Sequence, residues 1–209
     1  MVRKKLQFIY KFIISKLFQI IYGKIVFLNH NDDDVKIKEV NKEENNYKFI
    51  EINNGRIFTD YIEHVAVINK NQIIDFVSYQ QVKGVFKDPT FNVVIKKGTP
   101  KFKKKFNGKV FSLVQGASGN NNYFHWMFDI LPRLIILEKF YNLNDINFFY
   151  CPQIKPWQLS TLSIFNIGND KLINSNLHRH IQADKILAVS HPWYSKGLIL
   201  NEAKNLPSW

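Results

Sequence analysis

From residue 109 onward, short apolar runs alternate with longer segments that are apolar on one or more faces. We predict strands at 109–115, 146–151 and 185–190, and helices at 121–141, 156–166 and from about residue 200. Such alternation is typical of a parallel sheet covered by helices. In these sheets ligands bind beyond the carboxyl ends of the strands. The segments that directly follow the strands are therefore the first candidates for a functional site.

The preceding part of the chain has short β-like runs separated by polar turns. We predict strands at 47–52, 64–68, 73–79 and 91–95, with a further short run at 56–61. Asn54-Gly55 stands between the runs at 47–52 and 56–61, and this dipeptide is a strong signal for a two-residue hairpin turn. The pattern predicts a β-rich unit ahead of the α/β alternation.

Residues 3–22 have helical periodicity, with apolar side chains on one side and lysines on the other. A helix that spans a membrane needs about 20 predominantly apolar residues, and Lys11 and Lys16 interrupt this one. No small-residue cleavage site follows, which argues against a cleaved signal peptide. Two interpretations remain open: an amphipathic helix in the interface of an anionic membrane, or a helix packed on its own domain with a solvated basic face.

The chain therefore divides into four predicted parts. Residues 1–28 are the basic amphipathic helix, 29–46 an acidic and asparagine-rich exposed connector, 47–108 the β-rich unit, and 109–209 an α/β unit. With 45% hydrophobic residues, the chain can bury a sizeable core. Its single cysteine, Cys151, excludes an internal disulfide and fits a reducing compartment. Because Cys151 follows an apolar run, we interpret it as a buried, inert thiol.

The net charge of +12 is concentrated in two segments. Residues 1–31 carry six Lys and Arg and residues 89–128 carry seven Lys, with no acidic residue in either. Nucleic-acid binding is one interpretation of such basicity. However, no zinc-finger, helix-turn-helix or RNA-recognition pattern accompanies the charge, so we predict no nucleic-acid partner. An anionic membrane surface or a phosphate-bearing substrate explains the two segments as well.

Residues 116–136 are a glycine- and asparagine-rich turn that leads into a helix with one polar stripe. At roughly 100° per residue, the polar side chains fall on one narrow face of an otherwise apolar helix: Asn122, His125, Asp129 and Arg133. A helix that is apolar nearly all round is buried. Polar and charged groups on it are costly unless they pair or line a cavity. The stripe is therefore the leading candidate for chemistry.

His125 and Asp129 are spaced i, i+4, so their side chains can touch. An Asp that holds a His in one tautomer is a common way to build a general base near neutral pH. The alternative is a buried structural pair without a catalytic role. A metal site with i, i+4 ligands is a third interpretation, but no further ligand stands at a recognisable spacing. We predict neither a metal nor a cofactor.

The turn before this helix offers free backbone N–H groups, which suit an anion or a hydroxyl group. Its candidate substrate-binding side chains are Ser118, Asn120, Asn121 and Asn122. The alternative is that Ser118 or one of the asparagines simply caps the helix. Pro132 should kink the helix, and Arg133 could pair with Asp129 or reach a phosphate.

A second polar cluster follows the strand predicted at 185–190. Its candidate substrate-binding residues are His191, Trp193 and Tyr194. Because the carboxyl ends of parallel strands lie at one edge of a sheet, this cluster should meet the 118–125 segment on the same rim. Trp126 lies off the polar stripe, and we interpret it as a core residue.

The motif at 122–134, Asn-Tyr-Phe-His-Trp-Met-Phe-Asp-Ile-Leu-Pro-Arg-Leu, closely resembles the signature N-Y-x-H-W-x-x-D-x-L-P-R-L. That signature belongs to glycosyltransferase family 61, formerly domain of unknown function 563. Bacterial members are often labelled capsular polysaccharide biosynthesis proteins. The resemblance covers roughly residues 47–209.

The resemblance implies inverting transfer of a sugar from a nucleotide sugar to a glycan or lipid-linked hydroxyl acceptor. It implies that 109–209 is a Rossmann-like α/β unit resembling the N-terminal lobe of a GT-B glycosyltransferase, with His125 and Asp129 as the catalytic pair. The donor-binding lobe of such a fold would lie beyond residue 209, so the 209-residue chain alone is expected not to turn over a nucleotide sugar. We expect a cytoplasmic protein, peripheral on the inner face of the cell membrane through residues 1–24. The alternative, from a different class, is a non-catalytic carbohydrate- or membrane-binding module.

Overall fold

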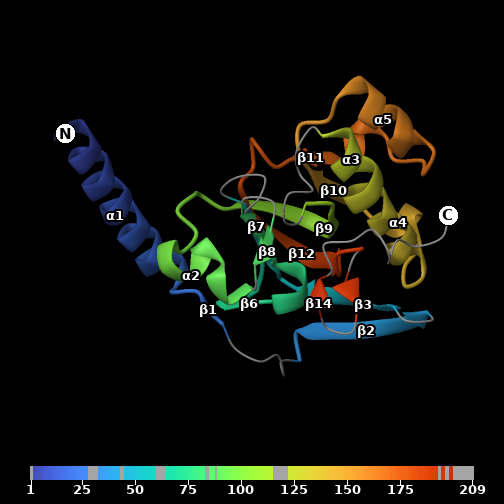
Figure 1. Ribbon diagram of the computed structural model, residues 1–209, viewed down its shortest axis with the longest axis horizontal. Helices are drawn as coiled ribbons and strands as arrows, with labels where there is room; N and C mark the ends of the chain where they lie inside the picture. The colour runs from blue at the N-terminus through green and yellow to red at the C-terminus, as the bar shows by residue number, and fades with distance from the viewer. Residues whose placement is uncertain are drawn as a thin grey trace.

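The computed structural model describes residues 2–27, 33–42, 45–59, 65–82, 85–87, 89–114, 122–192, 194–195 and 198–199. Within these residues the protein is a mixed α/β structure built on one ten-stranded sheet (Figure 1). Helix α1 extends away from the sheet at one end of the molecule, and the helix pair α4 and α5 lies at the other. No helix in these ranges is both long enough and apolar enough to cross a membrane.

The main sheet contains β1 (Val26–Phe27), β2 (Val35–Lys42), β3 (Asn45–Asn53), β4 (Arg56–Thr59), β5 (Val65–Asn69), β6 (Gln72–Ile73), β9 (Lys104–Ser112), β10 (Phe148–Cys151), β11 (Leu172–Asn174) and β12 (His180–Val189). Two small hairpins stand apart from it: β7 (Gln80–Val82) with β8 (Val85–Lys87), and β13 (Tyr194–Ser195) with β14 (Leu198–Ile199). The helices are α1 (Val2–Tyr22), α2 (Val93–Lys97), α3 (Tyr123–His125), α4 (Leu131–Glu138) and α5 (Pro156–Ser163). A π-helical turn, Trp126–Ile130, joins α3 to α4.

The sheet has a parallel half and an antiparallel half that meet at β12. Strands β12, β9, β10 and β11 are adjacent in that order and all parallel. On its other edge, β12 pairs antiparallel with β3 through residues 185–189 and with β4 through 180–182. The β-rich unit and the α/β unit therefore share one sheet. The boundary expected between residues 108 and 109 falls inside β9.

Alternate side chains of the parallel strands enter two separate cores, because successive residues of a strand point to opposite faces. Phe111 and Leu187 pack with the helical segment 126–137 on one face. Val110 and Ile186 pack on the other face against β3, β4 and β5. Both faces are therefore buried towards the carboxyl ends of the parallel strands, which explains why the apolar residues of β9 and β12 are consecutive there, at Val110–Phe111 and Ile186–Val189.

The predicted hairpin at Asn54-Gly55 is wrong, because β3 and β4 pair with β12 and with other strands rather than with each other. Asn54 donates its backbone N–H to the Asp184 carbonyl at 2.9 Å, and Ala183 donates to the Gly55 carbonyl at 3.1 Å. A Cβ on Gly55 would lie only 2.9 Å from the Cβ of Ile186. Gly55 is thus required for close approach of the chain to β12.

Two other predicted segments differ in the structure. The connector at 29–46 contains β2, whose alternating apolar and polar residues pair antiparallel with β3. The strand predicted at 91–95 is instead a 3-10 turn, Pro89–Phe91, followed by α2. The Asn92 side chain caps α2 by accepting from the Val94 N–H at 3.1 Å, and it donates to two carbonyls of the core.

The strand predicted at 73–79 is also mostly wrong. Only Ile73 of this segment belongs to β6, and a 3-10 turn follows at Asp75–Val77. The Asp75 carboxylate accepts the Phe76 N–H at 2.6 Å, which favours a turn over a strand. The helix expected from about residue 200 lies outside the described residues.

The helix predicted at 121–141 is confirmed as one continuous helical segment over 123–138, with a local change of pitch. The Leu131 N–H bonds to the Trp126 carbonyl, which is a π-helical connection. Pro132 directly follows this turn and has no N–H to donate. The expected disturbance therefore occurs, in the form of a π turn on the N-terminal side of the proline.

Candidate functional site

The helix that carries the polar stripe is the first described helix after β9 along the chain. Asn122 is its N-cap: the side-chain oxygen accepts the Phe124 backbone N–H at 2.9 Å. This is the capping role that we considered for the asparagines of the turn. The cap places the first helical turn, including His125, at the carboxyl-end edge of the parallel strands.

His125 and Asp129 form the central pair of the site. Nδ1 of His125 lies 2.5 Å from Oδ2 of Asp129, so the predicted contact is confirmed. The His125 side chain is 19% exposed, whereas that of Asp129 is 2% exposed. A hydrogen bond from Nδ1–H to the carboxylate leaves the lone pair on Nε2. The pair can therefore accept a proton at Nε2.

His191 reaches the same carboxylate from a different strand. It follows β12, is fully buried, and places Nε2 3.9 Å from Oδ1 of Asp129. This distance is too long for a hydrogen bond. Burial lowers the pKa of His191 well below 6.5, and the positive charge of Arg133 lowers it further. His191 is thus neutral at pH 7 and lies beside Asp129, the partner of His125. Residues 118–121 and Trp193, which were also predicted to meet on this rim, lie outside the described residues.

Arg133 is also inside the protein rather than on the rim. Its guanidinium donates to the Leu113 carbonyl at 3.2 Å, just beyond the end of β9. Burial lowers the pKa of Arg133 to about 9, while the negative charge of Asp129 opposes that change. Arg133 keeps its proton at pH 7. It therefore supplies a buried positive charge near Asp129, and His191 and Arg133 act on the site through that carboxylate.

The strand order gives this position a general significance. The chain proceeds from β9 to β10 and β11 on one side of β9, and then places β12 on the other side. The order reverses between β9 and β12, and ligands of open α/β sheets bind at such a switch point, outside the carboxyl ends of the strands. His125 follows β9 and His191 follows β12. The His125–Asp129 pair and His191 therefore lie at the switch point of the sheet.

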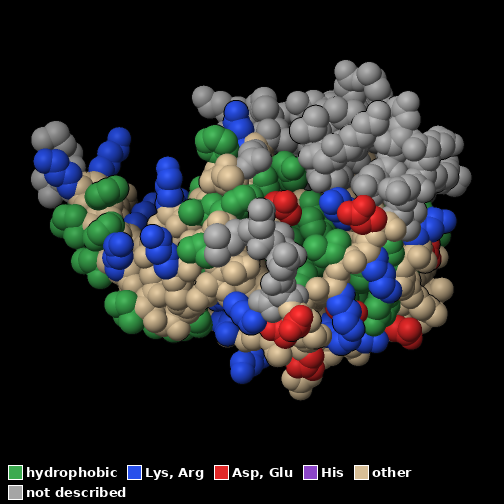
Figure 2. Space-filling view, turned by 90° about the horizontal axis from the view of Figure 1, so that it is seen from below, with side chains coloured by type: hydrophobic (Ala, Val, Ile, Leu, Met, Phe, Trp, Pro, Cys, Tyr) green, Lys and Arg blue, Asp and Glu red, His purple; other side chains and the backbone are tan. Residues whose placement is uncertain are grey.

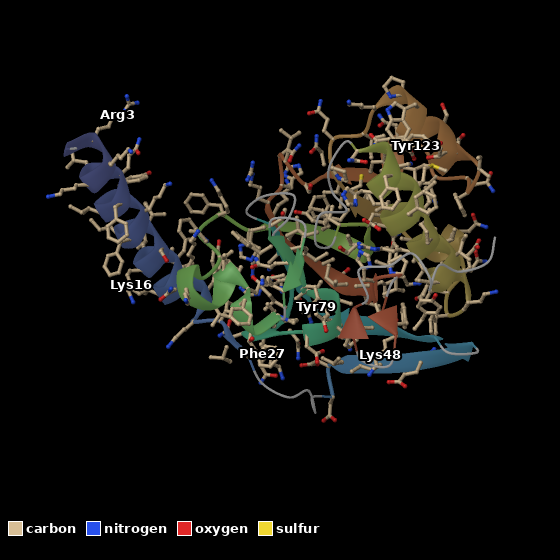
Figure 3. The ribbon with its side chains drawn as sticks, in the orientation of Figure 1. Arg3, Lys16, Phe27, Lys48, Tyr79 and Tyr123 are labelled. Carbon is tan, nitrogen blue, oxygen red and sulfur yellow. The ribbon has the colours of Figure 1, made fainter. Side chains whose placement is uncertain are left out.

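Exposed aromatic residues next to His125 were missed by the sequence analysis. Tyr123 is 65% and Phe124 43% exposed. Figure 3 labels Tyr123 at the start of the helical segment, and its ring lies 5.5 Å from that of Trp157 in α5. The Phe124 ring contacts His125 edge-on at 5.8 Å. The signal was present: these residues directly follow the capping residue Asn122, in the first turn of the helix.

Trp126, in contrast, is fully buried and donates its indole N–H to Thr161 at 2.8 Å, which confirms it as a core residue. Cys151 is likewise buried, and burial raises its pKa to about 12, as expected for an inert thiol. Four of the candidate residues, Ser118, Asn120, Asn121 and Trp193, lie outside the described residues. Of Tyr194 only the backbone, in β13, is described.

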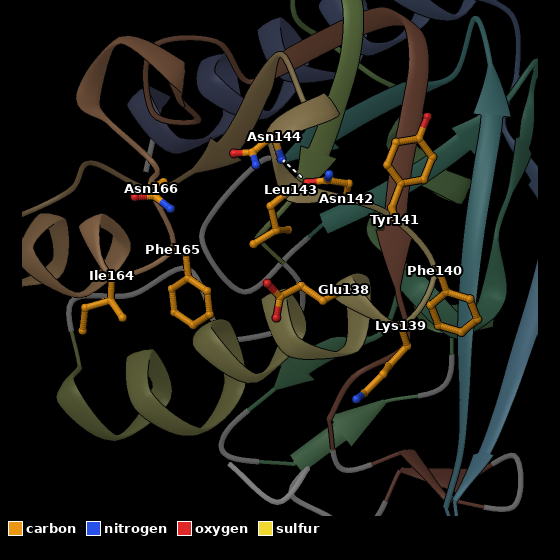
Figure 4. A pocket seen from close by; sticks show the side chains of 10 residues that line it. All are labelled: Glu138, Lys139, Phe140, Tyr141, Asn142, Leu143, Asn144, Ile164, Phe165 and Asn166. Carbon is orange, nitrogen blue, oxygen red and sulfur yellow. Dashed lines mark hydrogen bonds between the residues drawn. The ribbon is translucent and has the colours of Figure 1, made fainter.

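A surface hollow of about 630 Å³ lies at the opposite end of the same helix (Figure 4). It is lined by residues 138–144 and 164–166, which precede β10 or follow α5. The hollow is therefore at the amino end of the parallel strands, away from His125. Across the described ranges, no group of three or more His, Cys, Asp and Glu side chains is arranged to hold a metal ion.

No protein-family model matches the chain, and no curated protein matches it either.

Proposed function

We propose that the protein is an inverting glycosyltransferase of surface or capsular polysaccharide biosynthesis. In this proposal it transfers a sugar from a nucleotide sugar to a hydroxyl of a glycan or lipid-linked acceptor. The observation that carries the proposal is the His125–Asp129 pair, with Nδ1 and Oδ2 2.5 Å apart at the switch point of the sheet. The resemblance of residues 122–134 to the signature of glycosyltransferase family 61 supports the same reaction.

The proposed reaction is a single displacement. Nε2 of His125 accepts the proton of the acceptor hydroxyl while its oxygen attacks the anomeric carbon. The bond between that carbon and the nucleoside diphosphate breaks on the opposite face, so the anomeric configuration inverts. Asp129 stabilises the imidazolium that forms, and the positive end of the helix dipole favours the departing anion.

Arg133 and His191 are positioning residues in this scheme. The buried Arg133 cation, whose pKa is about 9, lies near the Asp129 carboxylate and interacts with it electrostatically. The neutral His191 ring fills the space beside Oδ1 without competing for the proton of His125. Together they flank the carboxylate behind the base.

The proposal includes the fold of the parallel half of the sheet. The parallel strands β12, β9, β10 and β11 have the order of a Rossmann-like half, in which a fourth strand is added next to the first. We infer that this half corresponds to the acceptor-side lobe of a GT-B-like enzyme. The exposed rings of Tyr123 and Phe124, next to His125, suit contact with the apolar face of a sugar ring. That contact equally supports the alternative function, a non-catalytic carbohydrate-binding module.

The test is an assay of the protein expressed from its complete reading frame. It would be incubated with a panel of nucleotide sugars and with glycan and lipid-linked acceptors extracted from the cells that encode it. We expect a glycosylated product whose new linkage, read by nuclear magnetic resonance, has the anomeric configuration opposite to that of the donor. Binding of glycan without turnover would favour the non-catalytic module. A product with retained configuration would exclude the single displacement.

A further inference from the structure

Helix α1 is attached to the rest of the protein by one face of its C-terminal half. Ser15 donates its hydroxyl to the Lys97 carbonyl at 2.5 Å, and Gln19 donates to the Lys96 carbonyl at 3.1 Å. The rings of Phe18 and Tyr22, on the same face, contact Phe102 and His180. These contacts, made to the end of α2, to the segment after it and to β12, fix the direction of the helix.

The main apolar stripe of α1 points the other way. It consists of Leu6, Ile9, Ile13, Leu17 and Ile20. At roughly 100° per residue, this stripe is about opposite the attached face. All five side chains are exposed, Ile20 by 83%. A helix that is held only by packing on its own domain usually buries its apolar stripe, whereas the described residues leave this stripe uncovered.

Positive charge flanks the outward stripe: at roughly 100° per residue, Arg3 lies on one side of it and Lys5 and Lys16 on the other. Arg3, Lys4, Lys5, Lys11 and Lys16 are all exposed on α1, which has no acidic residue. Figure 2 shows Lys and Arg side chains interleaved with hydrophobic ones over the projecting helix. The two basic segments of the sequence also meet here, since α1 docks on Lys96 and Lys97, and the Lys103 ammonium lies 5.4 Å from the centre of the Tyr22 ring.

We propose that the outward face of α1 forms a docking surface for an anionic lipid bilayer. Helix α1 would lie in the interface, with its outward stripe among the acyl chains and its lysines at the lipid headgroups. A second copy of the chain is a poorer occupant, because it would bring another acid-free basic helix against this one.

Flotation of the protein with lipid vesicles tests the proposal. We expect binding to vesicles of equal parts phosphatidylcholine and phosphatidylglycerol, weaker binding as salt increases, and little binding to phosphatidylcholine alone. Each basic residue near an anionic surface increases binding by roughly fivefold. The Lys5→Glu/Lys16→Glu variant should therefore bind at least about tenfold more weakly, whereas Lys36→Glu/Lys38→Glu, on the exposed β2 strand, should bind like the wild type.

The apolar part of the surface has its own matched pair of variants. Ile13→Ser/Ile20→Ser should lose vesicle binding, whereas Ile164→Ser/Leu177→Ser, which changes two equally exposed residues elsewhere, should retain it. Equal flotation of all four variants would overturn the proposal. So would an absence of vesicle binding together with a dimer, seen by analytical ultracentrifugation, that Ile13→Ser/Ile20→Ser dissociates. That result would identify a second copy as the occupant.

Discussion

His191 and Asp129 lie on segments that follow different strands, yet the His191 Nε2 is 3.9 Å from the Asp129 Oδ1. The other oxygen of the same carboxylate holds His125. Asp129 is thus the common element between the helix after β9 and the end of β12. Asp129 is buried near the Arg133 cation, so its carboxylate contacts His125 and is shielded from solvent.

The first prediction concerns this carboxylate. Asp129→Asn keeps the size of the side chain but removes the charge that stabilises a protonated His125. We expect the rate of sugar transfer to fall by about 10²–10⁴-fold, with little change in the KM of the acceptor. Steady-state kinetics on the folded variant measures both quantities. A variant that transfers sugar at the wild-type rate would show that Asp129 has only a structural role.

The second prediction is a loss of stability in mild acid. His180 is buried between the rings of Tyr22 and Phe58, and burial lowers its pKa to about 4. The unfolded chain binds this proton near pH 6.5, and the native state binds it only near pH 4. The unfolded state therefore gains protons first, and the free energy of unfolding falls as the pH drops from 6.5 towards 4.

For His180 this loss amounts to about 2 kcal/mol between pH 7 and pH 5. The lowered pKa of His191 acts in the same direction. Urea unfolding at the two pH values measures the change, and His180→Phe should reduce it by the His180 share. An identical pH dependence in His180→Phe would show that His180 is not the source.

The third prediction tests the junction between the two halves of the sheet. An added methyl group at Gly55 would lie 2.9 Å from side-chain carbons of Ile52 and Ile186. We expect Gly55→Ala to lower the free energy of unfolding by about 1–3 kcal/mol. Gly168→Ala is the matched control, because its methyl group would meet only the end of the flexible Asp170 side chain. Equal stability of the two variants in urea would contradict the close packing at Gly55.

Much of the parallel half could be predicted from the sequence. The carboxyl ends of its strands are apolar and buried on both faces. Its main helix has a clear polar stripe, so the contact between His125 and Asp129 followed from local spacing. The proximity of His191 to Asp129 could also be expected, because parallel strands end at one edge. That expectation did not depend on β10 and β11, the strands that lie between β9 and β12 in the sequence.

The errors arose where distant contacts override local signals. Asn54-Gly55 has the sequence of a hairpin turn, but β12 takes the hydrogen bonds of both flanking strands. Residues 91–95 have strand propensity, but Asn92 uses its amide on Val65 and Ser78 and caps a helix. The strand β2 was missed although it alternates, because its charges and its acidic neighbours suggested a connector.

His125→Ala removes Nε2, the proposed base for sugar transfer, and tests that role most directly. In the transfer assay with the complete protein, we expect the variant to lose at least about 10²-fold in kcat while it still unfolds cooperatively in urea. His178→Ala, which removes another half-buried histidine in the turn between β11 and β12, should retain activity. Wild-type turnover by folded His125→Ala would show that His125 is not the base.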